Sequence, residues 1–140
     1  MPASQRDISQ HDYRALADLR FLIRQFLATS ERMAQGRGLT PQQHQLLLAI
    51  EGRPPEAQPT IGYLADRLLI RHHSAVGLVD RLAEQGLVVR ETSIDDRRQV
   101  LVRLTPRAEA LLRDLAASHR EELRSLAPRL VEALGTVVEK

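Results

Sequence analysis

Arginine and histidine side chains gather at two places in this sequence where they could bind an anionic partner. The first is the run Arg71-His72-His73-Ser74, which stands at the start of a segment with helical apolar periodicity. Free backbone N–H groups at a helix start, together with cationic and hydrogen-bonding side chains, can hold a phosphate. The second is Asp96-Arg97-Arg98, in a polar stretch between two apolar runs. A carboxylate two residues from an arginine can hold the guanidinium in one rotamer, so that less entropy is lost on binding.

Both clusters also have a purely structural interpretation. The first could be an ordinary solvated helix start, and Ser74 rather than Arg71 could be its cap, which would shift the start by a few residues. The second could be a charged turn that its own ion pairs keep soluble. Surface ion pairs are worth roughly 0 to 1 kcal/mol, however, so stability alone is a weak reason for such a cluster.

The helix expected at residues 72–85 has two different faces. Its buried face should be formed by apolar side chains at helical spacing: Ala75, Val76, Val79, Leu82 and Ala83. Gly77 and Arg81 lie on the outward face. A glycine inside a helix costs about 1 kcal/mol relative to alanine, so Gly77 favours close approach by another molecule. Arg81 could reach a phosphate, or it could pair with Asp80, Glu84 or a neighbouring helix.

Short elements around these clusters are expected to place them on one small unit. Thr60 is a good N-cap for a first short helix, and Gly86 would end the second, because glycine adopts left-handed backbone at little cost. The apolar positions of the first helix are Ile61, Leu64, Ala65 and Leu68. An apolar run that begins at Leu87 and a segment of alternating character from Gln99 to Leu104 flank a polar turn over residues 92–98 and predict a β-hairpin. Two tightly joined helices followed by a hairpin are the outline of a winged helix-turn-helix.

The order of these segments resembles that of the MarR family of bacterial transcription regulators. The matching segments are Leu64-Ala65, Val79 to Leu82, Gly86 to Val88, Asp96 to Arg98 and Leu104 to Pro106. No single segment is specific, but their order and spacing over about 45 residues are. The resemblance implies a mainly α fold with a small β-hairpin wing, in which N- and C-terminal dimerisation helices flank the winged helix-turn-helix.

The resemblance also implies contacts with double-stranded DNA from both clusters. The implied DNA-binding residues are Arg71, His72, His73, Ser74, Gly77, Arg81, Asp96, Arg97 and Arg98. In this interpretation Asp96 orients Arg98 for insertion into a minor groove, while Arg97 meets a phosphate. The sequence departs from the family pattern at Leu69, where a glycine is common, and at Arg71, where a small N-cap is usual. These departures leave undecided at which residue the helix expected at 72–85, the recognition helix of the family, begins.

Helices are expected on both sides of this unit. Residues 8–33 carry apolar side chains at helical period without proline or glycine, so they predict one long helix. Thr40, Pro41 and Gln43 combine an N-cap, a first-turn proline and a capping-box glutamine, which predicts a helix from Pro41 to about Glu51.

The C-terminal part is expected to hold two helices. Thr105 would cap the first, with Pro106 at its first position, and the second should run from about Glu121 to Glu139. Pro128 would bend this last helix.

The helices expected at the two ends of the chain have more apolar surface than the winged helix-turn-helix alone could cover. They could complete one monomeric core, or, as the resemblance implies, they could interlock with those of a second copy. We expect a single domain over residues 1–140, with dimerisation helices at 8–33 and 106–139 and a winged helix-turn-helix at 40–105. The resulting homodimer would match a pseudo-palindromic operator.

Bulk composition restricts the class of protein further. The 140 residues include 20 basic and 18 acidic side chains, so the net charge of +2 does not by itself indicate a nucleic-acid binder. The absence of cysteine excludes disulfides, thiolate metal sites and a thiol redox switch. The sequence has no signal peptide and no apolar run long enough to cross a bilayer. We therefore expect a cytoplasmic protein without a membrane partner.

Enzyme motifs are missing. The sequence has no Gly-x-Ser-x-Gly elbow, no phosphate-binding glycine loop and no His-Glu-x-x-His pair, so we expect neither an enzyme nor a cofactor. A metal site built from His44 and His119 with an acid from a partner chain is conceivable, but most isolated histidines on helices are not ligands. We expect no metal site.

The resemblance implies a dimeric repressor that a small-molecule ligand releases from DNA. In many family members a small aromatic or phenolic acid binds between the dimerisation helices and the winged helix-turn-helix. Here Arg14, Arg20 and His44 are possible anion partners in a pocket walled by the first helix, the helix from Pro41 and the helix after Thr105. Two other functions stay open: a protein-interaction module of the same fold, and a metal or small-molecule sensor without DNA readout.

Overall fold

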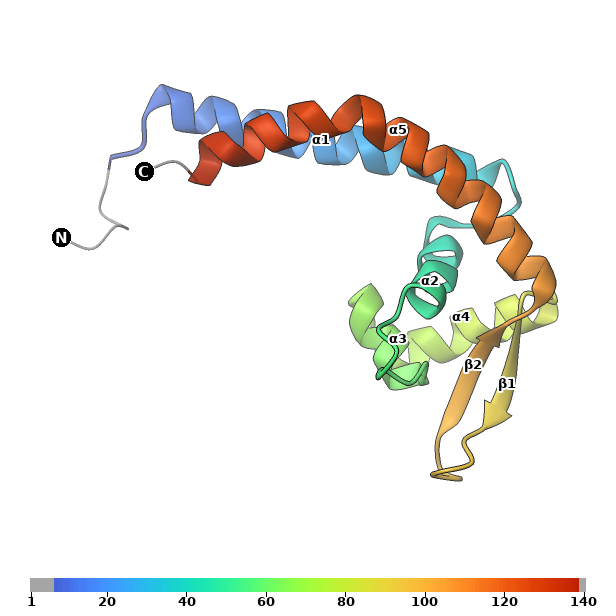
Figure 1. Cartoon of the computed structure of the whole chain (residues 1–140). Helices are drawn as coiled ribbons and strands as arrows, with labels where there is room; N and C mark the ends of the chain where they lie inside the picture. The colour runs from blue at the N-terminus through green and yellow to red at the C-terminus, as the bar shows by residue number, and fades with distance from the viewer. Residues whose placement is uncertain (1–6, 139–140) are drawn as a thin grey trace. The chain divides into compact units, whose positions relative to one another are not determined.

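A computed structural model describes residues 7–138 of the chain, which form two compact units (Figure 1). The central unit is Met33–Ala116, and the terminal unit comprises the residues up to Arg32 and those from Ala117 onward. Five helices and two strands are found in the described residues. These are α1 (Gln10–Gln35), α2 (Pro41–Glu51), α3 (Ile61–Leu68), α4 (His72–Glu84), β1 (Val88–Thr92), β2 (Val100–Leu104) and α5 (Pro106–Val138). The predicted mainly α fold with one small hairpin is confirmed.

Helix α2 begins and ends where its sequence signals predict. The Thr40 hydroxyl accepts a hydrogen bond from the Gln43 backbone N–H at 3.1 Å, and the Gln43 side chain accepts one from the Thr40 N–H at 3.0 Å. This reciprocal capping box, with Pro41 at the first helical position, satisfies N–H groups that the helix leaves unpaired. Leu46, Leu47 and Ile50 are then buried in the central unit.

Helices α3 and α4 are joined by a very short turn. Thr60 caps α3 by accepting a hydrogen bond from the Tyr63 N–H at 3.1 Å, as predicted. The turn is made by Leu69, whose backbone is left-handed at φ 58° and ψ 41° and whose side chain is 92% exposed. A left-handed backbone costs a residue with a Cβ roughly 1–2 kcal/mol, so this leucine occupies a conformation that favours glycine.

Helix α4 starts one residue after Arg71, which is the N-cap but makes no side-chain capping bond. The alternative in which Ser74 serves as the cap is therefore wrong. The first helical bond runs from the Ala75 N–H to the Arg71 carbonyl oxygen at 3.1 Å. At the other end Gly86 has φ +74°, and the Leu87 N–H donates to the Leu82 carbonyl at 2.9 Å, so the predicted glycine stop is confirmed.

The buried face of α4 differs from the predicted one. Its buried side chains are Ala75, Leu78, Val79 and Leu82, which follow the spacing i, i+3, i+4 and i+7. Val76 was predicted to be buried but is 36% exposed, and Ala83 is only half-buried. Val76 is one position, or about 100°, away from Ala75 around the helix, so it turns out of the core while Leu78 enters it.

The hairpin pairs β1 with β2 in antiparallel register, from Val88 opposite Leu104 to Thr92 opposite Val100. The end of the proline-rich loop joins this sheet, because the Val102 N–H donates to the Pro59 carbonyl at 2.9 Å and Thr60 forms a bridge with Leu101. The sequence predicted only a loop there, since proline lacks the N–H that a central strand needs. At the edge Pro59 uses only its carbonyl, so the missing donor does not matter.

One apolar core holds the central unit together. It takes side chains from the end of α1, from α2, α3, α4 and both strands, from the connecting loops and from the first part of α5. The buried members are Ala34, Leu39, Leu46, Leu47, Ile50, Leu64, Leu78, Val79, Leu82, Leu87, Val88, Val102, Ala108, Leu112 and Leu115. Residues 106–116 of α5 thus belong to the unit that contains the helix-turn-helix.

Helix α5 replaces the two C-terminal helices that the sequence predicted. It runs without a break from Pro106 to Val138, and the predicted end at Glu139 lies outside the described residues. The expected division near residue 120 contains neither proline nor glycine, so nothing there ends a helix. Pro128 lies within the helix.

The terminal unit has a smaller core of its own. Leu22, Leu126 and Ala133 are buried, and Leu19, Phe26 and Leu130 pack against them. Helix α1 covers Gln10–Gln35 instead of the predicted 8–33. No helix in the described part of the chain is both long and apolar enough to cross a membrane.

Helix α1 begins at a reciprocal cap. The Ser9 backbone N–H and hydroxyl donate to the Asp12 carboxylate at 2.9 and 3.0 Å, and the Asp12 N–H donates to the Ser9 hydroxyl oxygen at 3.2 Å. These hydrogen bonds from Ser9 lower the pKa of the Asp12 carboxyl. The start of α1 is thereby fixed two residues later than the periodicity alone predicts.

Candidate nucleic-acid interface

The start of α4 presents polar groups without an internal cap. Arg71, His72, His73 and Ser74 are all exposed, and no side chain bonds to this end of the helix. The first backbone N–H groups of a helix have no partner within the helix, and they carry its partial positive charge. The predicted constellation is therefore present on the surface, in a form suited to a phosphate or to hydrogen-bonding groups in a groove.

Gly77 and Arg81 lie next to each other on the outward face of α4. A Cβ added at Gly77 would stand 3.9 Å from Nη1 of Arg81, so the guanidinium lies beside the glycine. Arg81 forms no ion pair within residues 7–138, and Asp80 pairs with Arg90 of β1. The free space predicted at Gly77 is thus bordered by the Arg81 guanidinium. Asp80, one of the predicted alternative partners of Arg81, is paired with Arg90.

The ion pair between Asp80 and Arg90 also connects the two parts of the candidate interface. Asp80 belongs to α4 and Arg90 to β1, and these two elements are in contact. The sequence did not reveal this pair, because its members are ten residues apart on different elements. It ties α4 to the strand that leads into the wing.

In the hairpin loop, Asp96 holds Arg98 as predicted. Oδ1 of Asp96 accepts hydrogen bonds from the backbone N–H of Arg98 at 3.0 Å and from its Nε at 3.2 Å. The Arg98 side chain remains 92% exposed, and Arg97 is exposed as well. The guanidinium of Arg98 is therefore anchored at its base while its end is accessible to a partner.

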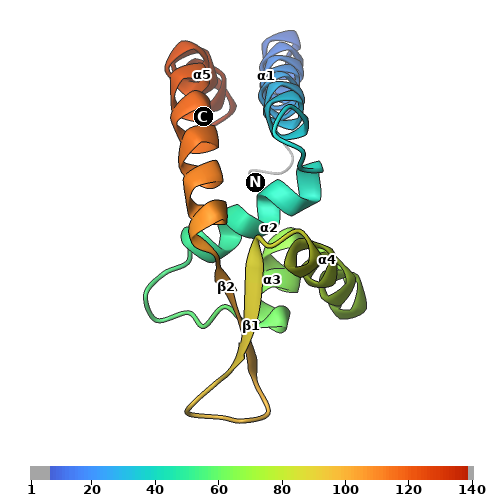
Figure 2. The same cartoon turned by 90° about the vertical axis from the view of Figure 1, so that its right-hand side faces the viewer.

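The loop over residues 93–99 is closed by its own hydrogen bonds. The Ser93 N–H donates to the Gln99 carbonyl at 3.0 Å, and the Gln99 N–H donates to the Asp96 carbonyl at 2.9 Å. The buried Ser93 hydroxyl accepts from the Asp96 N–H at 3.3 Å. Figure 2 shows this loop extending beyond α3 and α4 of the same unit. All nine predicted DNA-binding residues are thus on the central unit: four at the start of α4, Gly77 and Arg81 further along its outward face, and three in the wing.

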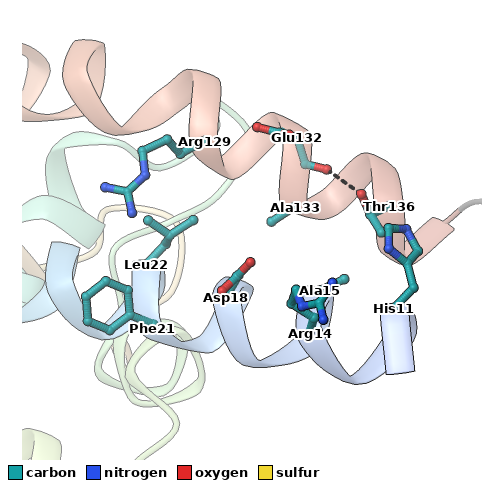
Figure 3. Close-up of a pocket in the computed structure, with 10 residues that line it drawn as sticks. All are labelled: His11, Arg14, Ala15, Asp18, Phe21, Leu22, Arg129, Glu132, Ala133 and Thr136. Atoms are coloured by element: carbon teal, nitrogen blue, oxygen red, sulfur yellow. Dashed lines mark hydrogen bonds between the residues drawn. The ribbon is translucent and has the colours of Figure 1, made fainter. Parts of the chain in front are cut away.

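A cavity of about 330 Å³ lies in the terminal unit (Figure 3). Its lining residues come from α1 and α5: His11, Arg14, Ala15, Asp18, Phe21, Leu22, Arg129, Glu132, Ala133 and Thr136. Figure 3 shows Arg129 extending from α5 toward α1, and Asp18 pointing from α1 toward α5. The cavity combines an aromatic wall with charges of both signs.

The three predicted effector residues do not line one pocket. Arg14 lines the cavity of the terminal unit, whereas Arg20 is exposed and does not belong to its lining. His44 is a buried side chain of α2 in the central unit. The cavity contains further candidates that the sequence did not single out, because Arg129 is distant in sequence from the first helix.

The histidines considered for a metal site are placed in different units. His119 lies in the terminal unit, where its Nε2 is 2.6 Å from the Ser30 hydroxyl and its ring meets Phe26 edge to face at 5.9 Å. His44 is in the central unit. Across residues 7–138, no three histidine, aspartate or glutamate side chains are grouped so that they could hold a metal ion.

Comparison with known proteins identifies the kind of fold. A model of the MarR family matches residues 37–99. The structure of a MarR family transcription regulator is 25% identical with a TM-score of 0.71, over 83% of this chain and 75% of that one. A probable transcriptional regulator from Pseudomonas aeruginosa is 28% identical with a TM-score of 0.62, over 84% and 92%. A MepR mutant from Staphylococcus aureus, bound to an oligodeoxyribonucleotide, shares the fold at 17% identity and a TM-score of 0.66, over 89% and 86%.

Proposed function

We propose that this chain is a winged helix-turn-helix protein of the MarR family and a non-enzymatic transcription regulator that binds specific DNA sequences; the MarR family model that matches residues 37–99 and the MarR structures that share its fold support this. The observation that carries this proposal is the pair of exposed cationic clusters on the central unit. One is the uncapped start of α4 with Arg71, and the other is the wing loop with Arg97 and Arg98. A helix start of this kind fits a major groove, and a wing arginine fits the adjacent minor groove.

Exposed apolar side chains in the terminal unit support a homodimer. They lie along both helices: Tyr13, Leu16, Phe21, Ile23 and Leu27 on α1, and Leu123, Val131, Leu134, Val137 and Val138 on α5. Each Å² of apolar surface removed from water contributes roughly 25 cal/mol, so a second copy could stabilise these helices considerably. A two-fold symmetric dimer would present two recognition helices to a pseudo-palindromic operator.

As a dimer bound across a promoter, the protein would act as a repressor. The two winged helix-turn-helix parts of the dimer must have a particular spacing to fit DNA. A ligand that binds better to a dimer with a different spacing would release it, and a coupling free energy of roughly 1 to 3 kcal/mol would be sufficient. The cavity of the terminal unit supports a small aromatic or phenolic acid as this ligand, because Phe21 offers an aromatic wall and Arg14 and Arg129 offer cations.

Selection of bound sequences from random duplex DNA, at about physiological salt, tests the DNA-binding proposal. We expect enrichment of a two-fold symmetric site with half-sites about one helical turn apart. The affinity for this site should fall steeply as salt rises, because phosphate contacts release counterions. If no sequence were enriched, the proposal would fail, and a protein-interaction module or a sensor without DNA readout would describe the chain better.

A further inference from the structure

Ile94 is the most exposed large apolar side chain in the described part of the chain, at 98%. It follows the buried Ser93, in a loop that is closed by two backbone–backbone hydrogen bonds and by one from the Asp96 N–H to the Ser93 hydroxyl. An isoleucine in this position contributes almost no buried area to the fold. Because the loop is held by its neighbours, Ile94 is fixed in an outward position that folding alone does not explain.

The surroundings of Ile94 indicate what it could contact. Arg97 and Arg98 are exposed in the same loop, and Arg98 is anchored by Asp96. In Figure 1 and Figure 2 this loop lies at the free end of the hairpin, beyond the helices of the central unit. A partner that covers the end of the hairpin would meet Ile94 as well as the two guanidinium groups. A partner surface that complements these side chains would combine phosphates for the two arginines with an apolar strip for Ile94.

We propose that Ile94 is an apolar DNA contact that packs into the minor groove beside Arg98. The inference rests on the proposed DNA-binding function. The walls of the minor groove are sugar faces, and apolar side chains are known to pack against them or between base steps. Such a contact depends on groove width and on the deformability of the base steps, so Ile94 would also contribute to sequence preference at the edges of the operator.

An apolar contact and a phosphate contact respond differently to salt. Loss of a cationic contact weakens binding and makes the salt dependence shallower, because fewer counterions are released. Loss of an apolar contact weakens binding equally at every salt concentration, since no counterion is involved. Salt titration can therefore distinguish Ile94 from Arg98 within the same loop.

The experiment measures the dissociation constant for the selected operator over a range of salt concentrations. It compares the wild-type chain with Ile94→Ser, Ile94→Leu and Arg98→Ala. Leu48→Ser is the control, because Leu48 is a 44% exposed apolar side chain of α2 in the same unit, outside both cationic clusters. We expect Ile94→Ser to weaken binding about tenfold with an unchanged salt slope. Ile94→Leu should restore most of the affinity, and Arg98→Ala should make the slope shallower by about one.

Wild-type affinity for Ile94→Ser would overturn the inference, and so would an equal loss of affinity in Leu48→Ser. A shallower salt slope for Ile94→Ser would also overturn it, because the effect would then act through the arginines. If the wild-type chain bound no DNA, the proposed function itself would fail and this inference with it. If the wild-type chain bound DNA and Ile94→Ser bound it with the same affinity, only the apolar contact would be refuted.

Discussion

Arg71 occupies a position at which a small polar residue would stabilise the helix more. Its side chain leaves the start of α4 uncapped, and an N-cap serine is worth about 1 kcal/mol to a helix. We expect Arg71→Ser to raise the free energy of unfolding by about 1 kcal/mol and to weaken DNA binding, with a salt slope shallower by about one. Denaturant unfolding and DNA titration measure the two effects.

Arg120→Ser is the control for this substitution, because Arg120 is exposed on α5 in the terminal unit. It removes the same charge at a place where no DNA contact is proposed. A more stable Arg71→Ser variant with unchanged DNA affinity would show that Arg71 is not a contact.

Leu69 is a second residue whose type and conformation disagree. Its left-handed backbone should make Leu69→Gly more stable than the wild type by about 1 kcal/mol in denaturant unfolding. Gly38, at φ +81° with open space around it, allows the reverse experiment. Gly38→Leu should lower the stability by a similar amount, and opposite signs for the two variants are required if the backbone is the cause.

At the level of elements, the sequence predicted best what short-range signals control. The capping box at Thr40 and the glycine stop at Gly86 depend on neighbouring residues, and both are confirmed. The continuity of α5 was missed because amphipathic periodicity weakens near residue 120 although no residue there ends a helix. Val76 instead of Leu78 was predicted to be buried, because periodicity fixes the position of a helix face only to within about one residue.

The candidate site shows the same limit. The Asp96–Arg98 pair was predictable, since its members are two residues apart. The pair between Asp80 and Arg90 joins two elements, and no local pattern signals it. Ile94 gave no signal either, because a single apolar residue in a polar turn has no periodicity. Its significance depends on its exposure, which only the structure reveals.

The Asp80–Arg90 pair should matter for binding more than for stability. Both side chains are partly exposed, so we expect Asp80→Ala and Arg90→Ala each to change the free energy of unfolding by less than about 1 kcal/mol. Each should weaken DNA binding several-fold, because the wing is then less firmly placed relative to α4. The double variant should be no weaker than the worse single variant. Fully additive losses in the DNA titration would contradict a coupled role.

For the whole molecule, the exposed apolar surface of the terminal unit predicts assembly. Val131 is 69% exposed, so Val131→Glu should leave the monomer folded but shift sedimentation velocity profiles toward the monomer and weaken operator binding. Leu126 is buried in the core of the terminal unit, and Leu126→Ala should instead lower the stability by about 2–5 kcal/mol. A Val131→Glu protein that remained dimeric would place the interface elsewhere.

The exposed end of the wing also makes this chain suited to protease footprinting. Arg97 and Arg98 are consecutive trypsin sites in an exposed hairpin end, whereas most other arginines lie in helices. Limited digestion should therefore cut first in the wing, since exposed loop tips are preferred cleavage sites. Operator DNA seated on the wing would shield these bonds. The time course of cleavage in the wing would then report the occupancy of the operator, without any label on the protein.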